Sequence, residues 1–462
     1  MVPVSGRRRV RGAGLSAVYE PSFESLRTRP LPRWYDDAKL GIFVHWTVGS
    51  VPAFAPAGRD PFTLAREEGE EAAFAKSPYA EWYQNSINIP GSPAAEYHEQ
   101  VLGSPDYGTF VDSFIEQADD WRSDQWRDLL RASHARYFVF VTKHHDGVLM
   151  WPSATGNPSY GGRWQARRDL VGECASIARD VGVRFGVYYS GGIDWTFQGV
   201  GIKNWATLFA AIPQDDTYAR YADAHWRELI ARYQPDVLWN DIGYPGFGEG
   251  AAPLIADFYN ANPDGVVNDR FDVLGVMSGR SHADFVTPEY TIEPVQRDRK
   301  FEVCRGIGTS FGYMQFEDES TYMPIADLVR MFVEIVADGG NLLLNIGPMP
   351  GGYVPWAQQV RVLALGQWLG VNGAAIFGSR PMEPSRLATD AGHAVRLTAG
   401  ADGAVYALVC GRPSSATVQI DGLPSGEVRV LANGARVARV GDRLVLPTRP
   451  DDTPVWTLRI ER

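Results

Sequence analysis

Several side chains of the types used in catalysis follow short apolar runs of the chain. If these runs are parallel strands of one barrel, their carboxyl ends meet on a single face, where barrel enzymes place their active sites. The residues concerned are His45, His144, His145, Tyr188, Tyr189, Asp241 and Arg270. Together, their types and their positions predict the active site of an enzyme.

Asp241 could act together with a second carboxylate. Asp241 ends the run VLWND and would be partly removed from water, so it needs a partner or a task. Glu289, in DFVTPEY, is the best second carboxylate, and Glu302, in FEVCRG, is a weaker rival. Such a pair is what glycoside hydrolysis requires, one group as nucleophile and the other as acid and base. The alternative for Asp241 is a purely structural ion pair with Arg270.

The motif TKHHDG at 142–147 permits more than one interpretation. Histidine is a common metal ligand, but adjacent strand residues point to opposite faces, so His144 and His145 cannot easily share one ion. No cysteine cluster or HExxH helix accompanies them. A metal site, buried structural histidines and histidines that bind substrate hydroxyls all stay open here.

Apolar runs alternate with amphipathic helical stretches over more than 300 residues. This alternation predicts a (β/α)8 barrel of parallel strands. We expect strands at 40–46, 136–145, 183–190, 236–241, 265–270 and 341–347, with a second strand near 85–90 and a seventh between 284 and 313. We expect helices at 123–134, 170–182, 218–233, 252–262, 325–340 and 356–373, the last ending in an Asn-Gly C-cap.

The pattern changes near residue 378, where helical periodicity stops and short strands separated by turns begin. We expect strands at 405–409, 416–420, 428–431, 443–446 and 455–460, which indicate a β-sandwich. The predicted organisation is a flexible segment at 1–20, a catalytic barrel at 21–377 and a sandwich at 378–462. The polar composition of residues 55–80 predicts a long loop near the face of the barrel that carries the active site.

Composition narrows the classes of partner. The 462 residues carry a net charge of −11, a poor match for nucleic acid or anionic lipid. No run is long and apolar enough for a membrane helix, and no secretory signal follows the N-terminus, so we expect a cytoplasmic protein. Three cysteines do not make a disulfide framework. Nothing in the pattern fixes the oligomeric state, and a homo-oligomer stays open.

The chain resembles glycoside hydrolase family 29, the retaining α-L-fucosidases, over most of residues 34–352. The motifs that carry the resemblance occur in the family's order. They are WYDDAKLGIFVHWTVGSVPAF (34–54), AEWYQN (80–85), YHEQVLG (97–103), FVTKHHDGVLMWPS (140–153), GVYYSGGIDW (186–195), LWNDIGYP (238–245), VNDR (267–270), RGIGTSFGY (305–313) and NLLLNIGPMPGG (341–352). The family's barrel and C-terminal sandwich agree with the pattern above.

The resemblance assigns roles to individual residues. Asp241 matches the family's nucleophile, although Asn240 stands where many members have an aromatic residue. Glu289 is the best match to the acid/base. The pattern does not decide whether Tyr188 or Tyr189 faces the sugar, and we choose Tyr188. The implied sugar contacts are His45, Glu81, Trp82, His144, His145, Tyr188, Trp239, Arg270 and Phe311.

The implied function is that of an exo-acting, retaining α-L-fucosidase. It would release L-fucose from a fucosylated oligosaccharide or glycoside through a covalent fucosyl-enzyme intermediate, with no metal or organic cofactor. The alternative is a carbohydrate-binding protein that has lost activity on the same fold.

Activity measured in the presence of a chelator tests whether the histidines bind substrate hydroxyls or a metal ion. Hydrolysis of an aryl α-L-fucoside should survive incubation with the chelator, and elemental analysis should find no tightly bound zinc. One zinc per chain, with activity lost on its removal, would contradict this prediction.

Overall fold

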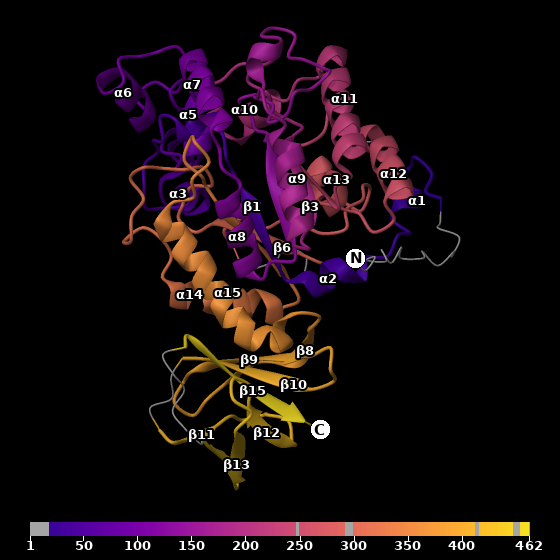
Figure 1. Ribbon diagram of the computed structural model, residues 1–462, viewed down its shortest axis with the longest axis vertical. Helices are drawn as coiled ribbons and strands as arrows, with labels where there is room; N and C mark the ends of the chain where they lie inside the picture. Colours follow the sequence, from indigo (N-terminus) through magenta and orange to yellow (C-terminus); the bar gives the residue numbers. More distant parts are fainter. Residues whose placement is uncertain (1–17, 246–248, 292–298, 412–414, 447–452, 462) are drawn as a thin grey trace, which may run out of the picture.

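The computed structural model describes residues 18–245, 249–291, 299–411, 415–446 and 453–461. It consists of a barrel of parallel strands surrounded by helices, with an antiparallel β-structure packed beneath helices α14 and α15 (Figure 1). The expected flexible segment 1–20 lies, up to residue 17, outside the described residues.

Seven parallel strands form the barrel sheet, in the spatial order β5-β4-β3-β2-β1-β7-β6. The strands are β1 (Leu40–Val44), β2 (Tyr137–Lys143), β3 (Arg184–Ser190), β4 (Val237–Asp241), β5 (Val266–Val267), β6 (Glu302–Gly306) and β7 (Asn341–Ile346). Nearly every strand residue is buried, as expected for a sheet that is covered on both faces.

An irregular segment at 284–290 fills the gap between β5 and β6. Phe285 forms an isolated parallel bridge with Asn268 beside β5, and Glu289 forms another with Cys304 of β6. The backbone N–H of Cys304 also donates to the carbonyl of Pro288 (3.1 Å). The barrel therefore closes, and the segment takes the place of an eighth strand. This arrangement confirms the predicted barrel fold.

Helices surround the barrel and connect its strands. In chain order they are α1 (Phe23–Leu26), α2 (Arg33–Ala38), α3 (Pro61–Glu68), α4 (Glu70–Ala75), α5 (Tyr83–Ser86), α6 (Pro93–Gln100), α7 (Tyr107–Asp119), α8 (Asp124–Ser133), α9 (Leu170–Asp180), α10 (Trp205–Ala210), α11 (Asp216–Tyr233), α12 (Ala252–Ala261), α13 (Val273–Met277), α14 (Ile325–Ala337) and α15 (Trp356–Ile376). None of those within the described ranges is long and apolar enough to cross a bilayer.

The structure corrects the predicted strand near 85–90, where helix α5 ends at Ser86 and a turn follows. Asn85 is buried there, and its side-chain amide binds the backbone of Gly201 and Ile202, which holds a turn rather than a sheet. The expected loop at 55–80 contains helices α3 and α4. Asp60 caps α3 by accepting from the Thr63 N–H (2.9 Å).

Two element ends also differ from expectation. Helix α15 does not stop at Asn-Gly but continues to Ile376, because its last residues Ala375 and Ile376 are buried in the core. Strand β5 ends at Val267, so Arg270 lies in the short 3₁₀ turn 269–271 rather than on a strand.

The C-terminal structure is one eight-stranded antiparallel sheet, folded on itself into a sandwich so that a bridge joins Thr389 and Ile420 near its two edge strands. Its strands are β8 (Arg380–Ala388), β9 (Ala394–Ala399), β10 (Val405–Cys410), β11 (Thr417–Gln419), β12 (Glu427–Val430), β13 (Arg436–Val440), β14 (Arg443–Val445) and β15 (Val455–Glu461).

Strands β8, β9 and β13 were not predicted. Two prolines in β8 obscure its pattern, and they are tolerated because β8 is an edge strand. The exact boundary at 377/378 stays a prediction.

A buried ion pair fixes the loop that follows β2. The Lys143 ammonium lies 2.9 Å from a carboxylate oxygen of Asp194, and both side chains are fully buried. Gly147, in the same loop, has a positive φ of 77°, and a Cβ there would come within 2.6 Å of the Asp194 carboxylate. The loop that carries the two adjacent histidines therefore depends on Asp194.

Replacing Asp194 by Asn should destabilise the fold by about 3–5 kcal/mol, because it leaves the Lys143 charge buried without a counter-charge. Chemical denaturation measures this loss. Asp216→Asn is the matched control, since Asp216 is exposed and pairs with Arg220 on the surface of α11. It should change the free energy of unfolding by less than about 0.5 kcal/mol. Equal losses for both variants would contradict the prediction.

Candidate active site

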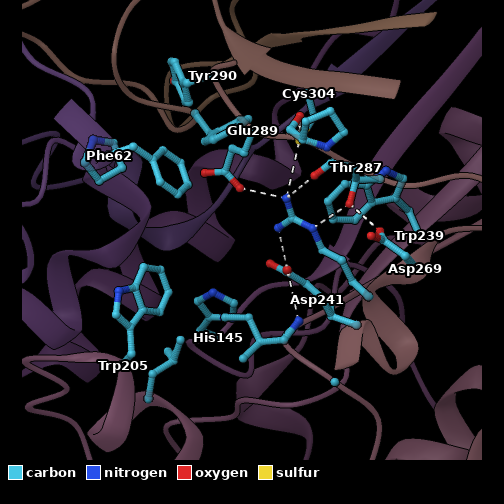
Figure 2. Close-up of a pocket in the computed structure, with 18 of the residues that line it drawn as sticks. Phe62, His145, Trp205, Trp239, Asp241, Asp269, Thr287, Glu289, Tyr290 and Cys304 are labelled. Atoms are coloured by element: carbon cyan, nitrogen blue, oxygen red, sulfur yellow. Dashed lines mark hydrogen bonds and ion pairs between the residues drawn. The ribbon is translucent and has the colours of Figure 1, made fainter. Parts of the chain in front are cut away.

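A cavity of about 1560 Å³ opens at the carboxyl ends of the barrel strands. Every predicted site residue lines it, although these residues come from segments spread over nearly the whole barrel. They are His45, Glu81, Trp82, His144, His145, Tyr188, Trp239, Asp241, Arg270, Glu289 and Phe311. Figure 2 shows His145, Trp239, Asp241 and Glu289 among them. The geometry thus brings the predicted set together in one place.

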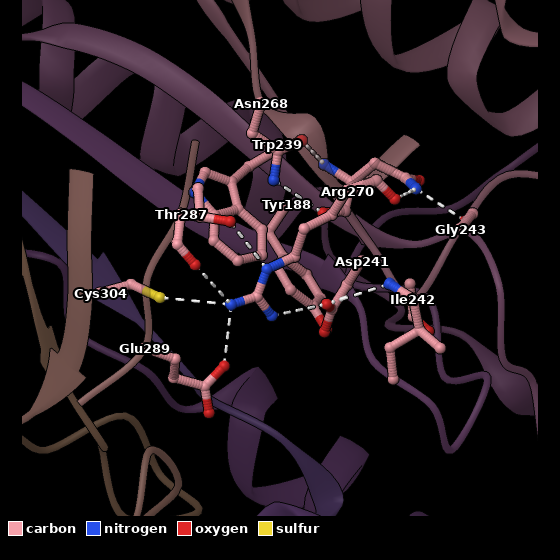
Figure 3. Close-up of polar contacts among 12 residues, drawn as sticks. Tyr188, Trp239, Asp241, Ile242, Gly243, Asn268, Arg270, Thr287, Glu289 and Cys304 are labelled. Atoms are coloured by element: carbon pink, nitrogen blue, oxygen red, sulfur yellow. Dashed lines mark hydrogen bonds and ion pairs between the residues drawn. The ribbon is translucent and has the colours of Figure 1, made fainter. Parts of the chain in front are cut away.

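The guanidinium of Arg270 lies between the two carboxylates (Figure 3). One terminal nitrogen is 2.9 Å from Asp241 Oδ1, and the other is 2.8 Å from Glu289 Oε2. The Arg270 Nε–H donates to the Thr287 hydroxyl (2.9 Å), and the guanidinium carbon lies 4.7 Å from the centre of the Trp239 ring. The Asp241–Arg270 ion pair therefore exists, but it belongs to a larger arrangement that also holds Glu289.

Asp241 ends β4 and is held in one orientation. Its Oδ2 accepts from the Tyr188 hydroxyl (2.8 Å), and its Oδ1 accepts from the backbone N–H of Ile242 (3.0 Å). Burial alone would raise the pKa of Asp241, but the Arg270 charge and the hydrogen bonds from Arg270 and Tyr188 outweigh burial and hold the pKa below its ordinary value. Asp241 is thus an ionised carboxylate facing the cavity.

The backbone after Asp241 is strained. Ile242 has a φ of 55°, in the left-handed region that a β-branched side chain rarely adopts. In this conformation its N–H points at the Asp241 carboxylate. Asn240 stabilises the turn from the opposite side of the strand, since its amide donates to the carbonyls of Gly243 (2.7 Å) and Arg270 (2.9 Å). The strain therefore serves to position the carboxylate.

Glu289 belongs to the irregular segment that closes the barrel. Its Oε2 faces Arg270, and its Oε1 accepts from the Tyr79 hydroxyl (2.5 Å). The rival Glu302 does not line the cavity. It is fully buried in the barrel interior, where it accepts from Tyr35, Tyr137 and Trp239. Of these two acids, only Glu289 faces the cavity with Asp241.

The three histidines converge on the floor of the cavity. His45 Nδ1 lies 2.6 Å from Asn345 Oδ1, and His145 Nδ1 lies 2.6 Å from the Ser190 hydroxyl. The rings of His144 and His145 are 4.0 Å apart, although strand alternation would separate them. They can share the cavity because β2 ends at Lys143 and a register shift precedes that residue.

Burial lowers the pKa of all three histidines. The pKa of His45 is lowered to about 4 and that of His145 to about 3. The pKa of His144 lies well below its ordinary value, because the neighbouring histidines add to the effect of burial. The imidazoles are therefore neutral. Each neutral ring offers one donor and one acceptor.

The remaining predicted residues form the walls. Glu81 is buried and accepts from the Gly312 N–H (2.7 Å), and burial raises its pKa to about 7. Trp82 packs edge-on against His145, with ring centres 5.1 Å apart, and Phe311 lies 4.9 Å from His45. The wall therefore combines apolar ring faces with few polar atoms.

The two tyrosines of β3 point in opposite directions. Tyr188 lines the cavity and donates to Asp241, whereas Tyr189 faces outward, with its hydroxyl 3.0 Å from His225 Nδ1. This is the strict alternation of a strand.

Sequence reasoning missed the residues that support this site. Tyr79, Thr287, Ser190 and Asn345 each hydrogen-bond one of the predicted side chains. Two of them, Tyr79 and Thr287, lie two residues from a predicted site residue. The other two, Ser190 and Asn345, lie within the family motifs at 186–195 and 341–352. Their closeness in the sequence to predicted site residues and motifs is the signal that could have identified them. No group of three metal-ligating side chains occurs among the residues that the structure describes.

The family model for α-L-fucosidase matches residues 10–374. This range spans the whole barrel. The chain belongs to the α-L-fucosidase family.

Known members of this family are similar over most of the chain. A tissue α-L-fucosidase from Rattus norvegicus is 30% identical over 471 aligned residues, which cover 96% of this chain and 93% of the relative. A plasma α-L-fucosidase from Homo sapiens is 33% identical and covers 78% of this chain and 72% of its own. The solved structure of a Thermotoga maritima α-fucosidase in complex with fucose has a TM-score of 0.83 at 37% identity, covering 96% of this chain and 100% of its own. A second Thermotoga maritima structure, in complex with a mechanism-based inhibitor, has a TM-score of 0.84 at 38% identity, with the same coverage.

The neutral histidines of this fucosidase family member make a testable link between pH and stability. Their pKa values are lowered in the folded protein, so below about pH 6.5 the unfolded chain binds protons that the folded chain does not. The free energy of unfolding should therefore fall as the pH drops from about 6.5 to 5, by up to about 1.4 kcal/mol per pH unit for each histidine.

Denaturant melts of the His145→Gln variant test the assignment. This variant removes one proton-binding group, so its stability should fall less steeply with acid than that of the parent. Ser190→Ala is the control, because it removes the hydrogen bond to His145 but not the titrating ring. A slope unchanged by His145→Gln would overturn the assignment of a neutral buried ring.

Proposed function

We propose that the chain is an exo-acting, retaining α-L-fucosidase in which Asp241 is the nucleophile and Glu289 the acid/base. The observation that carries this assignment is that the two carboxylates contact opposite ends of one guanidinium, Arg270, in a single cavity. The shared guanidinium places both carboxylates in the same part of the cavity, as a catalytic pair requires. Retention is what the family resemblance implies, and the azide experiment below tests it.

In the first step Asp241 attacks the anomeric carbon of fucose, and Glu289 gives a proton to the departing oxygen. The lowered pKa of Asp241 supports its role, since an ionised carboxylate is the attacking species. Glu289 must carry a proton in this step, and a protonated carboxyl loses its charge attraction to Arg270. Its contact with the Tyr79 hydroxyl does not depend on that charge.

In the second step Glu289 takes a proton from water, which attacks the fucosyl-enzyme ester and frees Asp241. As the ester breaks, charge returns to the Asp241 carboxylate. Arg270, the Tyr188 hydroxyl and the Ile242 N–H are already placed to stabilise that charge.

The sugar itself would be bound by the floor and the walls. With Nδ1 of His45 and of His145 already occupied, Nε2 of each ring is available for fucose hydroxyls. Glu81 and His144 would bind further hydroxyls, and Trp82, Trp239 and Phe311 offer apolar faces to the ring and its methyl group. The substrate is a fucosylated oligosaccharide or glycoside. The cytoplasmic location stays a prediction.

The two carboxylates can be separated by azide rescue. Asp241→Gly should lower turnover on any fucoside by on the order of 10⁴-fold or more, because the covalent intermediate cannot form. Glu289→Ala should keep more of the first step on an activated aryl fucoside, whose leaving group needs no proton, than on a fucosylated oligosaccharide. Azide should restore turnover in both variants but give different anomers.

The anomer of the fucosyl azide decides the roles. In Glu289→Ala, azide attacks the fucosyl-enzyme after one inversion, so the product should have the α configuration of the substrate. In Asp241→Gly, azide attacks the substrate directly, and the product should be β. Glu24→Ala is the control, since Glu24 is an exposed carboxylate at the cavity mouth. The same anomer from both active-site variants would refute the division of roles. Wild-type protein that binds fucosides without hydrolysing them would instead support the inactive alternative.

A further inference from the structure

A chain of aromatic rings leads from the floor of the cavity to its mouth. His145 packs against Trp82 at a ring separation of 5.1 Å. Trp82 lies 6.2 Å from Phe74, and Phe74 lies 5.5 Å from Trp205, each pair edge to face. The first two rings are at or near the predicted fucose site, whereas Trp205 lies beyond it. The wall that would bind the sugar therefore continues outward as an apolar surface.

The outer end of this wall exposes large apolar side chains. Trp205 is 46% exposed, Phe62 42% and Phe209 55%, and all three line the cavity. They come from two separate helices, with Phe62 on α3 and the other two on α10. Scattered exposed apolar residues are ordinary, but several that gather in one cavity mark a place where a ligand covers them.

Trp205 is held in place despite its exposure. It is the first residue of α10, whose N-terminus is fixed by a capping box between Asn204 and Thr207. The backbone N–H of Trp205 also donates to the Glu70 carboxylate of α4, which ties the two helices together. These contacts fix the backbone of Trp205, and its ring packs edge to face on Phe74, so a ligand that stacks on the indole orders little additional protein.

The position of this surface relative to the carboxylates indicates what would bind there. Phe62 and Trp205 lie on one side of the cavity and face the space beside Glu289 and Asp241 (Figure 2). If Glu289 donates a proton to the departing oxygen, the group attached to that oxygen lies on the Glu289 side of the fucose ring. The cavity, at about 1560 Å³, is also larger than ordinary small-molecule pockets of roughly 300–1,000 Å³.

We propose that Trp205 and Phe62 form the leaving-group subsite and select aglycones that present a flat ring. This inference rests on the proposed function and adds the class of substrate. The shared chemistry is stacking of an apolar ring face on an indole. An aryl aglycone and the apolar face of a second pyranose both supply it, and the experiment below distinguishes these two sources.

The test compares three substrates in the full-length chain: methyl α-L-fucoside, which has no ring in the leaving group, 4-nitrophenyl α-L-fucoside, and an α-L-fucosyl-galactose disaccharide. Trp205→Ala should lower kcat/KM roughly ten-fold on at least one ring-bearing substrate and much less on the methyl fucoside. A selective loss on the nitrophenyl substrate identifies aryl aglycones, and a selective loss on the disaccharide identifies a second sugar. Trp205→Phe should restore most of the loss because it keeps a flat ring.

Trp356→Ala is the matched control. Trp356 is also an exposed tryptophan at the first position of a helix, α15, but it does not line the cavity. It should leave all three values unchanged. Phe62→Ala provides a second test from another helix and should show the same substrate dependence as Trp205→Ala.

Two failures can be told apart. If the wild-type chain hydrolyses none of the three substrates, the proposed function is wrong. If it hydrolyses them, but Trp205→Ala and Phe62→Ala affect the methyl fucoside as much as the ring-bearing substrates, the leaving-group subsite is wrong and the fucosidase assignment stands.

Discussion

The double contact of Arg270 is the interaction on which the rest of the site depends. One guanidinium binds Asp241 and Glu289 at once, and its positive charge offsets the repulsion between the two carboxylates. The arginine is in turn fixed by Thr287 and by the face of Trp239. Because a guanidinium is planar and rigid, its two terminal nitrogens hold one carboxylate each in a fixed relation to the same group.

The way the barrel closes explains how Glu289 comes to face Asp241. Thr287 and Glu289 are two residues apart, so an extended backbone directs both side chains to the same face, and both meet Arg270 there. The segment 284–290 keeps this alternation although it makes only isolated bridges to its neighbours. The bridges to β6 and to the chain beside β5 thus place Glu289 opposite Asp241.

The cavity has a polar floor and an apolar mouth. Histidines that burial keeps neutral form the floor. The chain of aromatic rings from Trp82 to Trp205 extends outward from this floor. This division agrees with a substrate whose reacting sugar carries hydroxyl groups and whose remaining part is recognised mainly by shape and stacking. Contacts outside the cavity hold both regions in place. Ser190 and Asn345 hydrogen-bond the histidines of the floor, and the contact between helices α4 and α10 supports the mouth.

The sequence by itself determined the residue types of the site, the alternation that makes a barrel, and the change to a sandwich near residue 378, because apolar periodicity and local motifs are short-range properties of the chain. Only the tertiary structure decided that Tyr188 rather than Tyr189 meets Asp241, and that Glu302 is buried beneath the cavity while Glu289 faces it. It also decided that residues 55–80 form helices over the mouth and that 284–290 closes the barrel. These features depend on strand register and on contacts between segments that are distant in the chain, such as Tyr79 with Glu289, and no local pattern encodes such contacts.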